Sequence, residues 1–333
     1  MVKWLLGAAL TLTGLAVLAA AGFYFALKRP DIAYETLASR YENAASRYAD
    51  LAGGVHMHYR DQGQSAGAPT LLLIHGYGAS LQTWEQWEAR LGEDFRVISL
   101  DLPGHGLTNA PAGYRPSIEA FRDIVAEFAR VQGLTRFTIV GSSMGGNVAW
   151  EYALAYPEQV DALILVDAAG WPETRDDLAE DPLIFKLLRN PLAAPILRDL
   201  DNTRLIRQGL LASFGNRELV DDAMVARYAE LARAPGHRDI LLQLMLDRSA
   251  RNDATAERLA ALTPPVLILH GAQDNLIPPA HAQQFKDAIA QAELVIFEGV
   301  GHVPQEEIPE QSAQAAWDFL YRVHEGAALA PAP

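Results

Sequence analysis

The stretch Ile139-Val-Gly-Ser-Ser-Met-Gly-Gly-Asn147 constrains the fold of this chain more than any other, because it predicts a strand that turns sharply into a helix. An apolar run from Phe137 to Val140 forms the strand, and apolar residues recur at helical spacing after the turn. Gly141 and Gly145 stand two positions on either side of Ser143, where a strained turn leaves no room for side chains. The Ser143 hydroxyl is therefore expected to project from the end of a strand.

Composition narrows the classes of partner. The chain carries 27 basic and 41 acidic residues, a formal net charge of −14, and no cluster of lysine and arginine. Nucleic acid is not expected as a partner, because phosphate binding needs concentrated positive charge. The absence of cysteine excludes disulfides, thiolate nucleophiles and cysteine-ligated zinc. With 333 residues, the chain is long enough for one large α/β domain with an insertion, or for two smaller domains.

An uncharged stretch near the N-terminus predicts a membrane anchor. The 24 residues from Trp4 to Leu27 carry no charge and are flanked by Lys3 and Lys28. As a helix that rises about 1.5 Å per residue, this stretch spans a hydrocarbon core of about 30 Å. A cleaved signal peptide is the alternative, with Ala19-x-Ala21 as the cleavage site, but the apolar stretch is long for a signal peptide and continues beyond that site.

The charges around this stretch indicate its orientation. Lys28, Arg29, Arg40 and Arg47 follow it and outnumber Lys3, which precedes it. The positive-inside rule then favours a cytoplasmic globular domain by a small margin. A periplasmic or extracellular domain is the alternative.

Strands and helices alternate over most of the remaining chain. Apolar runs predict buried strands at Leu71 to Ile74, Phe95 to Leu100 and Ala162 to Val166. Helical spacing predicts helices over Gln82 to Leu91 and Ile118 to Val131. Alternation at this spacing is typical of the α/β class with a mainly parallel, doubly wound sheet.

A helical insertion interrupts this α/β core. Helical patterns after Trp171 include Leu183 to Leu188 and are broken by prolines and glycines, without any strand-like run. They predict an inserted cap, and a polar linker precedes the core. The predicted boundaries are 4–27 for the anchor, 28–53 for the linker, 54–170 and 254–324 for the α/β core, 171–253 for the helical cap and 325–333 for a disordered tail.

Polar residues that suit acyl transfer follow the later strands. Asp274 comes after the strand Val266 to Leu269, and His302 comes after the strand Leu294 to Phe297. Because loops after the carboxyl ends of parallel strands gather at one edge of a sheet, these side chains can meet Ser143. Acyl transfer needs a nucleophile, a base and a carboxylate that orients the base. Asp167, which follows the preceding strand, is the competing acid.

Three motifs together resemble the α/β-hydrolase superfamily over residues 54–323. His75-Gly-Tyr-Gly78 is similar to its oxyanion loop, Gly141-Ser-Ser-Met-Gly145 to its nucleophile elbow, and Gly301-His302 to its late catalytic histidine. The order serine, aspartate, histidine is also the order in which such hydrolases carry their triad. The resemblance implies catalytic roles for Ser143, Asp274 and His302.

The same resemblance implies an oxyanion hole. The backbone N–H groups of Tyr77 and Met144 would bind the developing negative charge, and His75, Gly76 and Gly78 would shape the loop. No cofactor or metal ion is expected. The Gly76-x-Gly78 sequence does not continue to the third glycine of a dinucleotide fingerprint.

Several less specific sequence similarities indicate a subfamily. The N-terminal stretch, the elbow sequence, Tyr156-Pro157 and Asp167-Ala-Ala-Gly170 together resemble membrane-anchored monoacylglycerol lipases and related bacterial lipases and esterases. A glycerol or similar ester with a medium to long acyl chain is the substrate that this similarity implies. Apolar residues of the cap suit an acyl chain, although packing within the cap explains them about as well: Leu183, Ile184, Phe185, Leu187, Leu188, Leu192 and Ile196.

Other activities remain open. Serine at the elbow argues against dehalogenases and epoxide hydrolases of this fold, whose family nucleophile is aspartate. Carbon–carbon bond hydrolases share the triad, but their oxyanion loop typically resembles His-Gly-x-Gly-Pro-Gly. The same loop in this chain is His75-Gly-Tyr-Gly-Ala-Ser80. Perhydrolases carry a proline in that loop, and lactonases are a further alternative. A non-catalytic, membrane-tethered binding protein is the alternative from another class.

The remaining histidines suggest no metal site. His56 and His58 lie two apart on a predicted strand, but solvent-facing strand positions fit them better, and no third ligand is evident. His237, His281 and His324 are expected at the surface.

Overall fold

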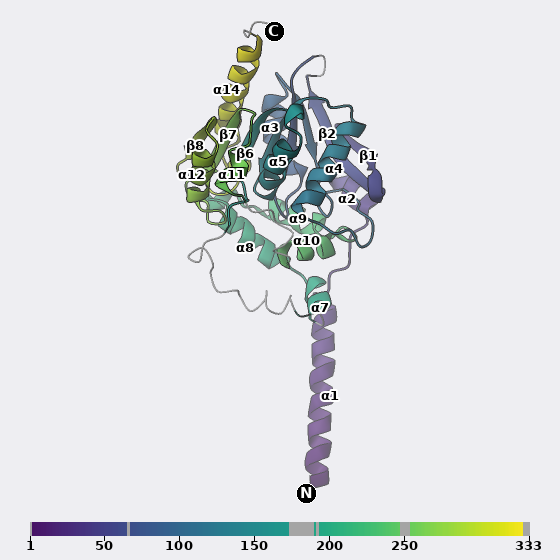
Figure 1. The fold of residues 1–333 in the computed structure, drawn as a ribbon. Coiled ribbons are helices and arrows are strands. Elements are labelled where there is room, and N and C mark those ends of the chain that lie inside the picture. Colours follow the sequence, from purple (N-terminus) through teal and green to yellow (C-terminus); the bar gives the residue numbers. More distant parts are fainter. Residues whose placement is uncertain (1, 65–66, 173–189, 191–192, 247–253, 329–333) are drawn as a thin grey trace.

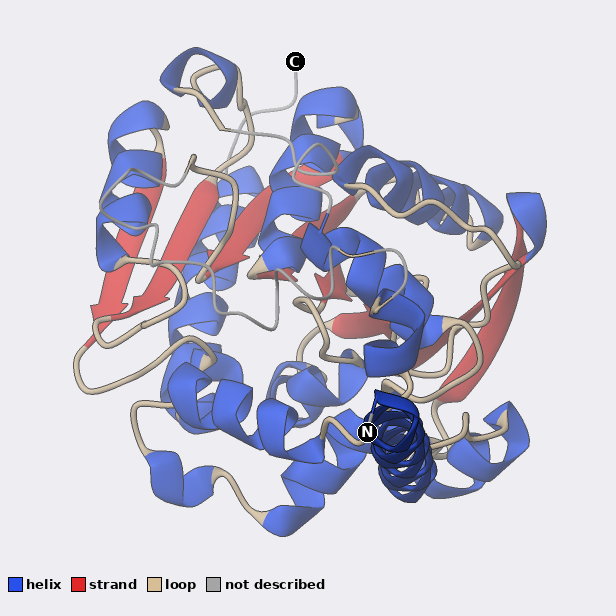
Figure 2. Ribbon diagram, turned by 90° about the horizontal axis from the view of Figure 1, so that it is seen from below, coloured by secondary structure: helices blue, strands red, loops and turns tan. Residues whose placement is uncertain are grey.

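The structure, a computed structural model, describes residues 2–64, 67–172, 190, 193–246 and 254–328. Within these ranges an eight-stranded sheet crosses the domain in the order β1-β2-β4-β3-β5-β6-β7-β8, with helices on both of its faces (Figure 2). The strands are β1 (Ser46–Leu51), β2 (Val55–Gly63), β3 (Thr70–Ile74), β4 (Arg96–Leu100), β5 (Phe137–Ser142), β6 (Val160–Val166), β7 (Val266–Gly271) and β8 (Ala292–Phe297).

The sheet is mainly parallel, as predicted. β1 pairs with β2 and β2 with β4 in antiparallel register, whereas every other neighbouring pair is parallel. The carboxyl ends of β3 and β5 to β8 therefore lie at one edge. Because both faces are covered, the central strands are continuously apolar, and Leu71 to Ile74 are fully buried.

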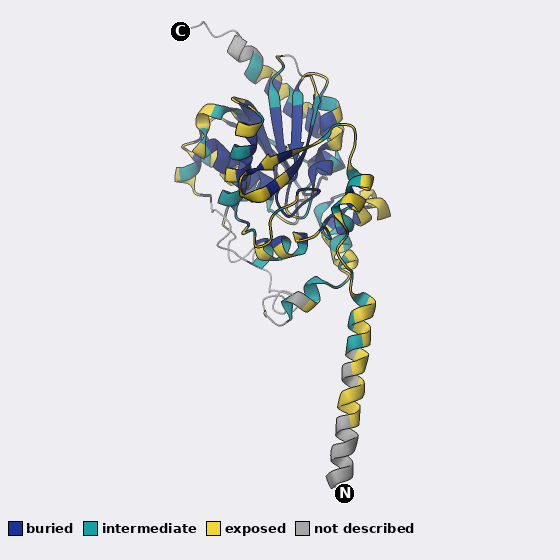
Figure 3. Ribbon diagram, turned by 90° about the vertical axis from the view of Figure 1, so that its right-hand side faces the viewer, coloured by how far each residue is buried: buried dark blue, intermediate teal, exposed yellow. Residues whose placement is uncertain are grey.

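Alternate strand residues pack against two separate layers of helices. Leu72 and Ile74 face one cluster, and Leu71 and Leu73 face the other. Figure 3 shows this buried core on both sides of the strands. The first layer contains α4 (Ile118–Val131), α5 (Met144–Ala155), α11 (Ala256–Leu259) and α12 (Pro279–Ala288), and the second contains α3 (Glu85–Leu91) and α14 (Pro309–Ala328).

Helix α4 illustrates how local sequence sets an element. Ser117 caps its N-terminus by accepting a 3.1 Å hydrogen bond from the N–H of Ala120. Phe121, Val125 and Phe128 recur at helical spacing and are buried against the sheet. The helix has the limits that the sequence predicts.

The insertion between β6 and β7 is helical in its described part. It contains α7 (Ala194–Arg198), α8 (Thr203–Ser213), α9 (Asp222–Leu231) and α10 (His237–Leu246). Helices α8 and α10 lie on the side of the domain from which the N-terminal helix projects (Figure 1). The predicted helix Leu183 to Leu188 lies outside the described residues.

The N-terminal stretch forms one long helix, α1 (Val2–Leu27), which projects away from the domain (Figure 1). Leu12, Leu15 and Leu18 expose 58 to 70% of their surface along it. In the part of the chain that the structure describes, no helix is both long enough and apolar enough to cross a membrane. The predicted transmembrane anchor over residues 4–27 is therefore unsupported by the structure.

The predicted linker over residues 28–53 is wrong in its extent. It contains α2 (Tyr34–Tyr41) and the edge strand β1, which pairs with β2 from Ser46 and Arg60 to Leu51 and Val55. Only Ala49 and Leu51 of β1 are buried, so the strand lacks the apolar alternation that would have revealed it. The sheet thus begins at residue 46 and not at residue 54.

The C-terminal boundary also differs. Helix α14 continues to Ala328, beyond the predicted end of the core at residue 324. The rest of the predicted tail, residues 329–333, lies outside the described residues.

Backbone hydrogen bonds join the segment after α1 to the cap. The N–H of Arg29 donates to the carbonyl of Asp199, and the N–H of Asp201 donates to the carbonyl of Leu27, each over 2.8 Å. Ion pairs add to this contact, with Arg29 lying 2.8 Å from Asp201. The base of α1 is thus attached to the helical insertion.

Candidate active site

Ser143 occupies a strained turn between β5 and α5. Its φ of 53° and ψ of −118° lie in a region that residues with side chains rarely adopt. A Cβ atom on Gly141 would come within 2.1 Å of the Gly145 carbonyl, and one on Gly145 within 2.3 Å of the Ile74 carbonyl. The two glycines are therefore required for close backbone approach, which agrees with the sequence interpretation.

The loop after β3 lies directly against Ser143. A Cβ atom on Gly76 would be 3.0 Å from the Ser143 Cβ. Gly78, with φ of 68°, allows the loop to turn back. Met144 is the first residue of α5, so its N–H has no acceptor within the helix and belongs to a positive helix end. The predicted oxyanion loop and elbow are thus brought together.

His75 holds this loop through both ring nitrogens. The N–H of Leu102 donates to Nε2 over 3.0 Å, and Nδ1 lies 2.8 Å from the Gly76 carbonyl. Because Nε2 accepts, the proton must be on Nδ1, and the ring is neutral. Burial lowers the pKa of His75 and favours the same state.

Asp274 and His302, from the loops after β7 and β8, form a direct pair. His302 Nδ1 lies 2.7 Å from Asp274 Oδ2, and both residues are 6% exposed. Asp274 Oδ1 accepts from the N–H groups of Leu276 and Ile277. Burial alone would raise the pKa of Asp274, but the hydrogen bond and charge of His302 outweigh it, so the pKa lies below its ordinary value.

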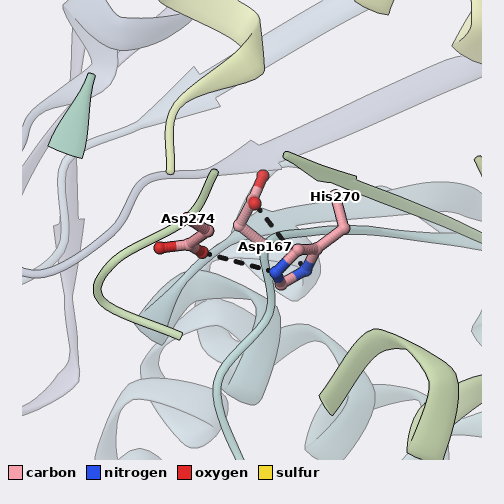
Figure 4. A group of neighbouring side chains, drawn as sticks. All are labelled: Asp167, His270 and Asp274. Atoms are coloured by element: carbon pink, nitrogen blue, oxygen red, sulfur yellow. Dashed lines mark ion pairs between the residues drawn. The ribbon is translucent and has the colours of Figure 1, made fainter. Parts of the chain in front are cut away.

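Asp167, the competing acid, has a different partner. Its Oδ1 accepts a 2.9 Å hydrogen bond from the N–H of Gly271 and lies 3.6 Å from His270 Nδ1 (Figure 4). Burial first, and then the charge of Asp274, raise the pKa of Asp167 well above its ordinary value. The raised pKa favours the neutral, protonated form of Asp167, whereas the lowered pKa of Asp274 favours its charged form. Asp274 is therefore the better partner for a histidine cation.

Asp167, His270 and Asp274 also offer ligand atoms within 4.8 Å of one another (Figure 4). Two carboxylates and an imidazole are donors that a divalent cation accepts. Here, however, Asp274 Oδ2 already contacts His302, and the raised pKa of Asp167 means that a proton competes with a cation. We derive no metal-dependent step from this group, which the sequence interpretation did not identify.

The strand histidines do not form a metal pair. His58 is fully buried, contrary to the expectation of a solvent-facing position, and its Nδ1 lies 2.7 Å from Asp101 Oδ2. His56 pairs instead with Asp50 at 2.7 Å. Both rings contact the ring of Tyr48, at centroid distances of 4.6 Å and 5.2 Å, so the two histidines share a face of the strand. Their carboxylate partners differ, and Asp101 is buried whereas Asp50 is exposed.

Two other histidines are also buried where exposure was expected. His237 contacts the Leu231 carbonyl through Nδ1 and the Tyr34 hydroxyl through Nε2. His281, on α12, is 6% exposed and lines the cavity described below. Helical periodicity alone could not reveal these contacts, because the covering residues come from distant parts of the chain. His324 is partly buried.

Glu307, in α13 (Pro304–Glu307), links the histidine loop to the cap. Its carboxylate accepts hydrogen bonds from the N–H groups of Gly301 at 2.9 Å, Gly215 at 3.0 Å and Asn216 at 2.6 Å. The N–H of His302 donates to the Ser213 carbonyl over 2.6 Å. Glu307 could not be predicted from the sequence, because no local pattern indicates partners about 90 residues away.

A cavity of about 660 Å³ lies between the sheet edge and the cap. Ser143, Tyr77, Met144 and His302 all contribute to its wall. The cap contributes Leu210, Tyr228 and Leu244. The predicted nucleophile, base and oxyanion residues, which come from separate loops, therefore line one cavity, and Asp274 contacts it through His302.

Comparison with known proteins identifies the family. Residues 69–309 match the family model described as the alpha/beta hydrolase fold. The chain belongs to the α/β-hydrolase family. Its fold and its relatives are those of hydrolases, including lipases and esterases.

Relatives within the α/β-hydrolase family differ in activity. Lipase 1 of Psychrobacter immobilis is 29% identical over 282 residues, covering 79% of this chain and 80% of the lipase. A 2-hydroxymuconate semialdehyde hydrolase of Pseudomonas sp. strain CF600 is 29% identical over 279 residues, covering 81% of this chain and 92% of that enzyme. The crystal structure of a bacterial membrane phospholipase A matches with a TM-score of 0.69 and 27% identity, covering 97% of this chain and 99% of that one.

Substitution can distinguish the roles of the two buried aspartates, Asp274 and Asp167. We expect Asp274→Asn to lower kcat for ester hydrolysis by about 10⁴-fold, because an amide cannot stabilise the His302 cation and favours the wrong tautomer. We expect Asp167→Asn to lower kcat less than about tenfold, because the amide oxygen can still accept from Gly271. Steady-state kinetics with a p-nitrophenyl ester measures both.

Thermal melting of both variants serves as the control for folding. A larger loss of kcat in Asp167→Asn than in Asp274→Asn, with both variants folded, would reverse the assignment of the acid.

Proposed function

We propose that the protein is a serine carboxylic-ester hydrolase of the lipase or esterase type, acting through Ser143, His302 and Asp274. The observation that carries this proposal is the 2.7 Å contact of His302 Nδ1 with Asp274 Oδ2, because His302 lines the same cavity as Ser143. A carboxylate on Nδ1 leaves Nε2 able to accept a proton from a serine hydroxyl. The strained turn at Ser143 presents that hydroxyl at the end of a strand.

The mechanism has two halves. His302 takes the proton of Ser143 as Oγ attacks the ester carbonyl, and the resulting oxyanion accepts hydrogen bonds from the N–H groups of Tyr77 and Met144. The alcohol leaves with the proton from His302. Water, deprotonated by His302, then attacks the acyl-enzyme and releases the acid. Asp274 stabilises the histidine cation in both halves.

Lipid esters with a medium to long acyl chain, including monoacylglycerols, are the substrates that we favour. The relatives named as a lipase and a phospholipase support this class. Apolar side chains on the cavity wall, including Ile118, Leu244 and Met245, suit an acyl chain. The cap residues proposed from the sequence lie outside the described residues, except Ile196, which is 51% exposed on α7.

Carbon–carbon bond hydrolysis is the second candidate. The 2-hydroxymuconate semialdehyde hydrolase, at 29% identity, favours it. The oxyanion loop argues against it. This chain has Ala79 and Ser80 at the two positions where the loop of such hydrolases typically has proline and glycine. Lactonase and perhydrolase activities share the same machinery, and a non-catalytic binding protein would retain the fold without using it.

We also propose that α1 attaches the domain to a lipid surface, on the cytoplasmic side. Exposed Leu12, Leu15 and Leu18 would lose water contact on binding lipid. The match to a membrane phospholipase A over 97% of this chain supports the association.

Removal of the nucleophile tests the catalytic proposal. We expect Ser143→Ala to lower kcat by about 10⁴-fold or more with the fold intact, because no other group supplies the attacking oxygen. A fluorophosphonate probe should label the wild type and not this variant. Ser142→Ala, at the neighbouring hydroxyl, should still be labelled. Ester hydrolysis retained in Ser143→Ala would contradict the proposal, and a folded wild type that the probe does not label would favour a binding protein.

A series of acyl chain lengths tests the substrate class. With p-nitrophenyl and monoacylglycerol esters, we expect kcat/KM to rise from acetyl to medium chains, because each buried methylene contributes about 0.8 kcal/mol. Activity restricted to acetyl esters would overturn the lipid assignment.

Charge placed on α1 tests lipid attachment. In the full chain, Leu12→Glu combined with Leu18→Glu should reduce co-sedimentation with phospholipid liposomes, because charged side chains enter lipid unfavourably. Leu205→Glu, at an exposed leucine of the cap, is the matched control and should bind as the wild type does. Equal binding by all three proteins would refute attachment through α1.

A further inference from the structure

The side chain of Tyr77 reaches from the oxyanion loop to the cap. Its hydroxyl donates a 3.0 Å hydrogen bond to the carbonyl of Leu241, in the middle of α10. A carbonyl oxygen has two lone pairs, so Leu241 can accept this bond and keep its place in the helix. The mechanism above uses only the backbone N–H of Tyr77. The contact of its hydroxyl with α10 is therefore a separate feature of the same residue.

The two ends of the oxyanion loop are fixed by the loop that follows β4. The Gly76 carbonyl contacts the ring of His75, which in turn accepts from the N–H of Leu102. At the other end, the N–H of Leu81 donates to Asp101 Oδ1 over 2.8 Å. All of these residues are buried. The ends of the oxyanion loop therefore cannot shift without breaking buried hydrogen bonds.

The tip of the loop has weaker backbone support. Tyr77 and Gly78 form a turn, which the N–H of Ala79 closes by donating to the Gly76 carbonyl. This bond measures 3.3 Å, which is longer than is usual for an N–H and a carbonyl. Tyr77 is 45% exposed, so packing restrains it only in part. Its hydrogen bond to α10 therefore adds a restraint that the turn itself lacks.

Helix α10 is a firm support for this bond. Ile240 lies so close to the loop after β4 that a Cβ atom on Gly104 would collide with its side chain. At the start of the helix, the guanidinium of Arg238 donates to the Arg29 carbonyl over 2.9 Å. The helix is therefore held against both the core and the segment that follows α1.

Fixing the hydroxyl of Tyr77 also restrains its backbone. A tyrosine side chain has only two rotatable bonds between its Cα atom and its hydroxyl-bearing ring. The hydroxyl is held by Leu241, and the ring lies edge-on to His105 with 6.3 Å between ring centroids. The N–H that would bind the oxyanion belongs to the same residue. Because hydrogen bonds weaken steeply as they depart from linearity, a small rotation of this N–H would reduce its effect.

We propose that the Tyr77 hydroxyl is a positioning group, which ties the tip of the oxyanion loop to cap helix α10 and so aims the Tyr77 N–H at the oxyanion. The inference rests on the proposed ester hydrolase function and gives the cap a task beyond shaping the cavity. The hydroxyl bonds a helix carbonyl and not the substrate. Its removal should therefore weaken binding of the transition state and leave binding of the ground state almost unchanged.

Tyr77→Phe, which removes only this hydroxyl, tests the proposal. In the full chain with p-nitrophenyl decanoate, we expect kcat per active site to fall about tenfold while KM stays within about threefold. Complete removal of one oxyanion donor costs about 10²- to 10³-fold in kcat, and here the donor remains but is less well aimed. Active sites are counted by titration with a fluorophosphonate, so that a partly folded sample does not imitate the loss.

Two ketones report on the oxyanion directly. Ser143 Oγ adds to the carbonyl carbon of decyl trifluoromethyl ketone, the Ser143 proton passes to His302, and the carbonyl electron pair moves to the oxygen as an oxyanion. Decyl methyl ketone has the same chain, but its carbonyl is not activated for this addition. The ratio of the two inhibition constants therefore measures the oxyanion hole, with chain binding cancelled. We expect Tyr77→Phe to reduce the preference for the trifluoromethyl ketone about tenfold, with the methyl ketone bound as before.

Tyr41→Phe is the matched control. The Tyr41 hydroxyl also bonds the cap, donating to Glu230 Oε2 over 2.9 Å, but it joins α2 to α9 and not the oxyanion loop to α10. Its loss should leave kcat and the ketone ratio within about twofold of the wild type. Thermal melting of both variants shows whether the fold is kept.

The outcomes separate the inference from the proposed function. A ketone ratio lowered in Tyr77→Phe and kept in Tyr41→Phe supports positioning through α10. An unchanged ratio in Tyr77→Phe, equal weakening of both ketones, or a similar loss in Tyr41→Phe would overturn it, while ester hydrolysis by the wild type stands. If the wild type hydrolyses no ester and does not prefer the trifluoromethyl ketone, the ester hydrolase proposal fails and the inference fails with it.

Discussion

The left-handed turn at Ser143 is the constraint on which the surrounding loops depend. The N–H of Ser143 donates to the Val166 carbonyl, and the Ser143 carbonyl accepts from Ala169, so the ends of β5 and β6 are held together. Gly145 packs against the Ile74 carbonyl and brings in β3. Backbone strain of about 1 to 3 kcal/mol persists at such a residue only because its neighbours over-determine it. The serine and the loop that would bind an oxyanion are therefore positioned by the same contacts.

Two adjacent carboxylates extend this rigidity to the cap. Glu307 accepts from Gly215 and Asn216, and Glu306 accepts from the side chains of Arg227 and Tyr228. Hydrogen bonds to a charged group contribute about 1.5 to 3 kcal/mol each, and a carboxylate left unpaired here would be partly desolvated. This part of the cap thus cannot move away from His302 without breaking several such bonds. The cap and the histidine loop behave as one unit.

The sequence predicted those features that local pattern determines. Continuous apolar runs identified the buried strands, and the spacing of glycines identified the turn at Ser143. Strand β1 was missed because an edge strand with two buried residues has no such pattern. The partners of Glu307 and His58 could not be inferred, because buried polar contacts depend on which distant segments meet. The roles of Ser143, Asp274 and His302 remain predictions, although Ser143 and His302 line one cavity and Asp274 contacts His302.

The attachment of α1 has a consequence for the cavity. The ion pairs at its base are partly exposed, so salt screens them and they contribute little. The backbone bonds of Leu27 and Arg29 with residues 199–201 are the firmer connection, and they lead to the cap and not to the sheet. Because the cap is joined to the His302 loop through Glu307, the route from α1 to the candidate active site runs through hydrogen bonds of the insertion. Substitutions in the insertion are therefore expected to change both the orientation of α1 and the shape of the cavity.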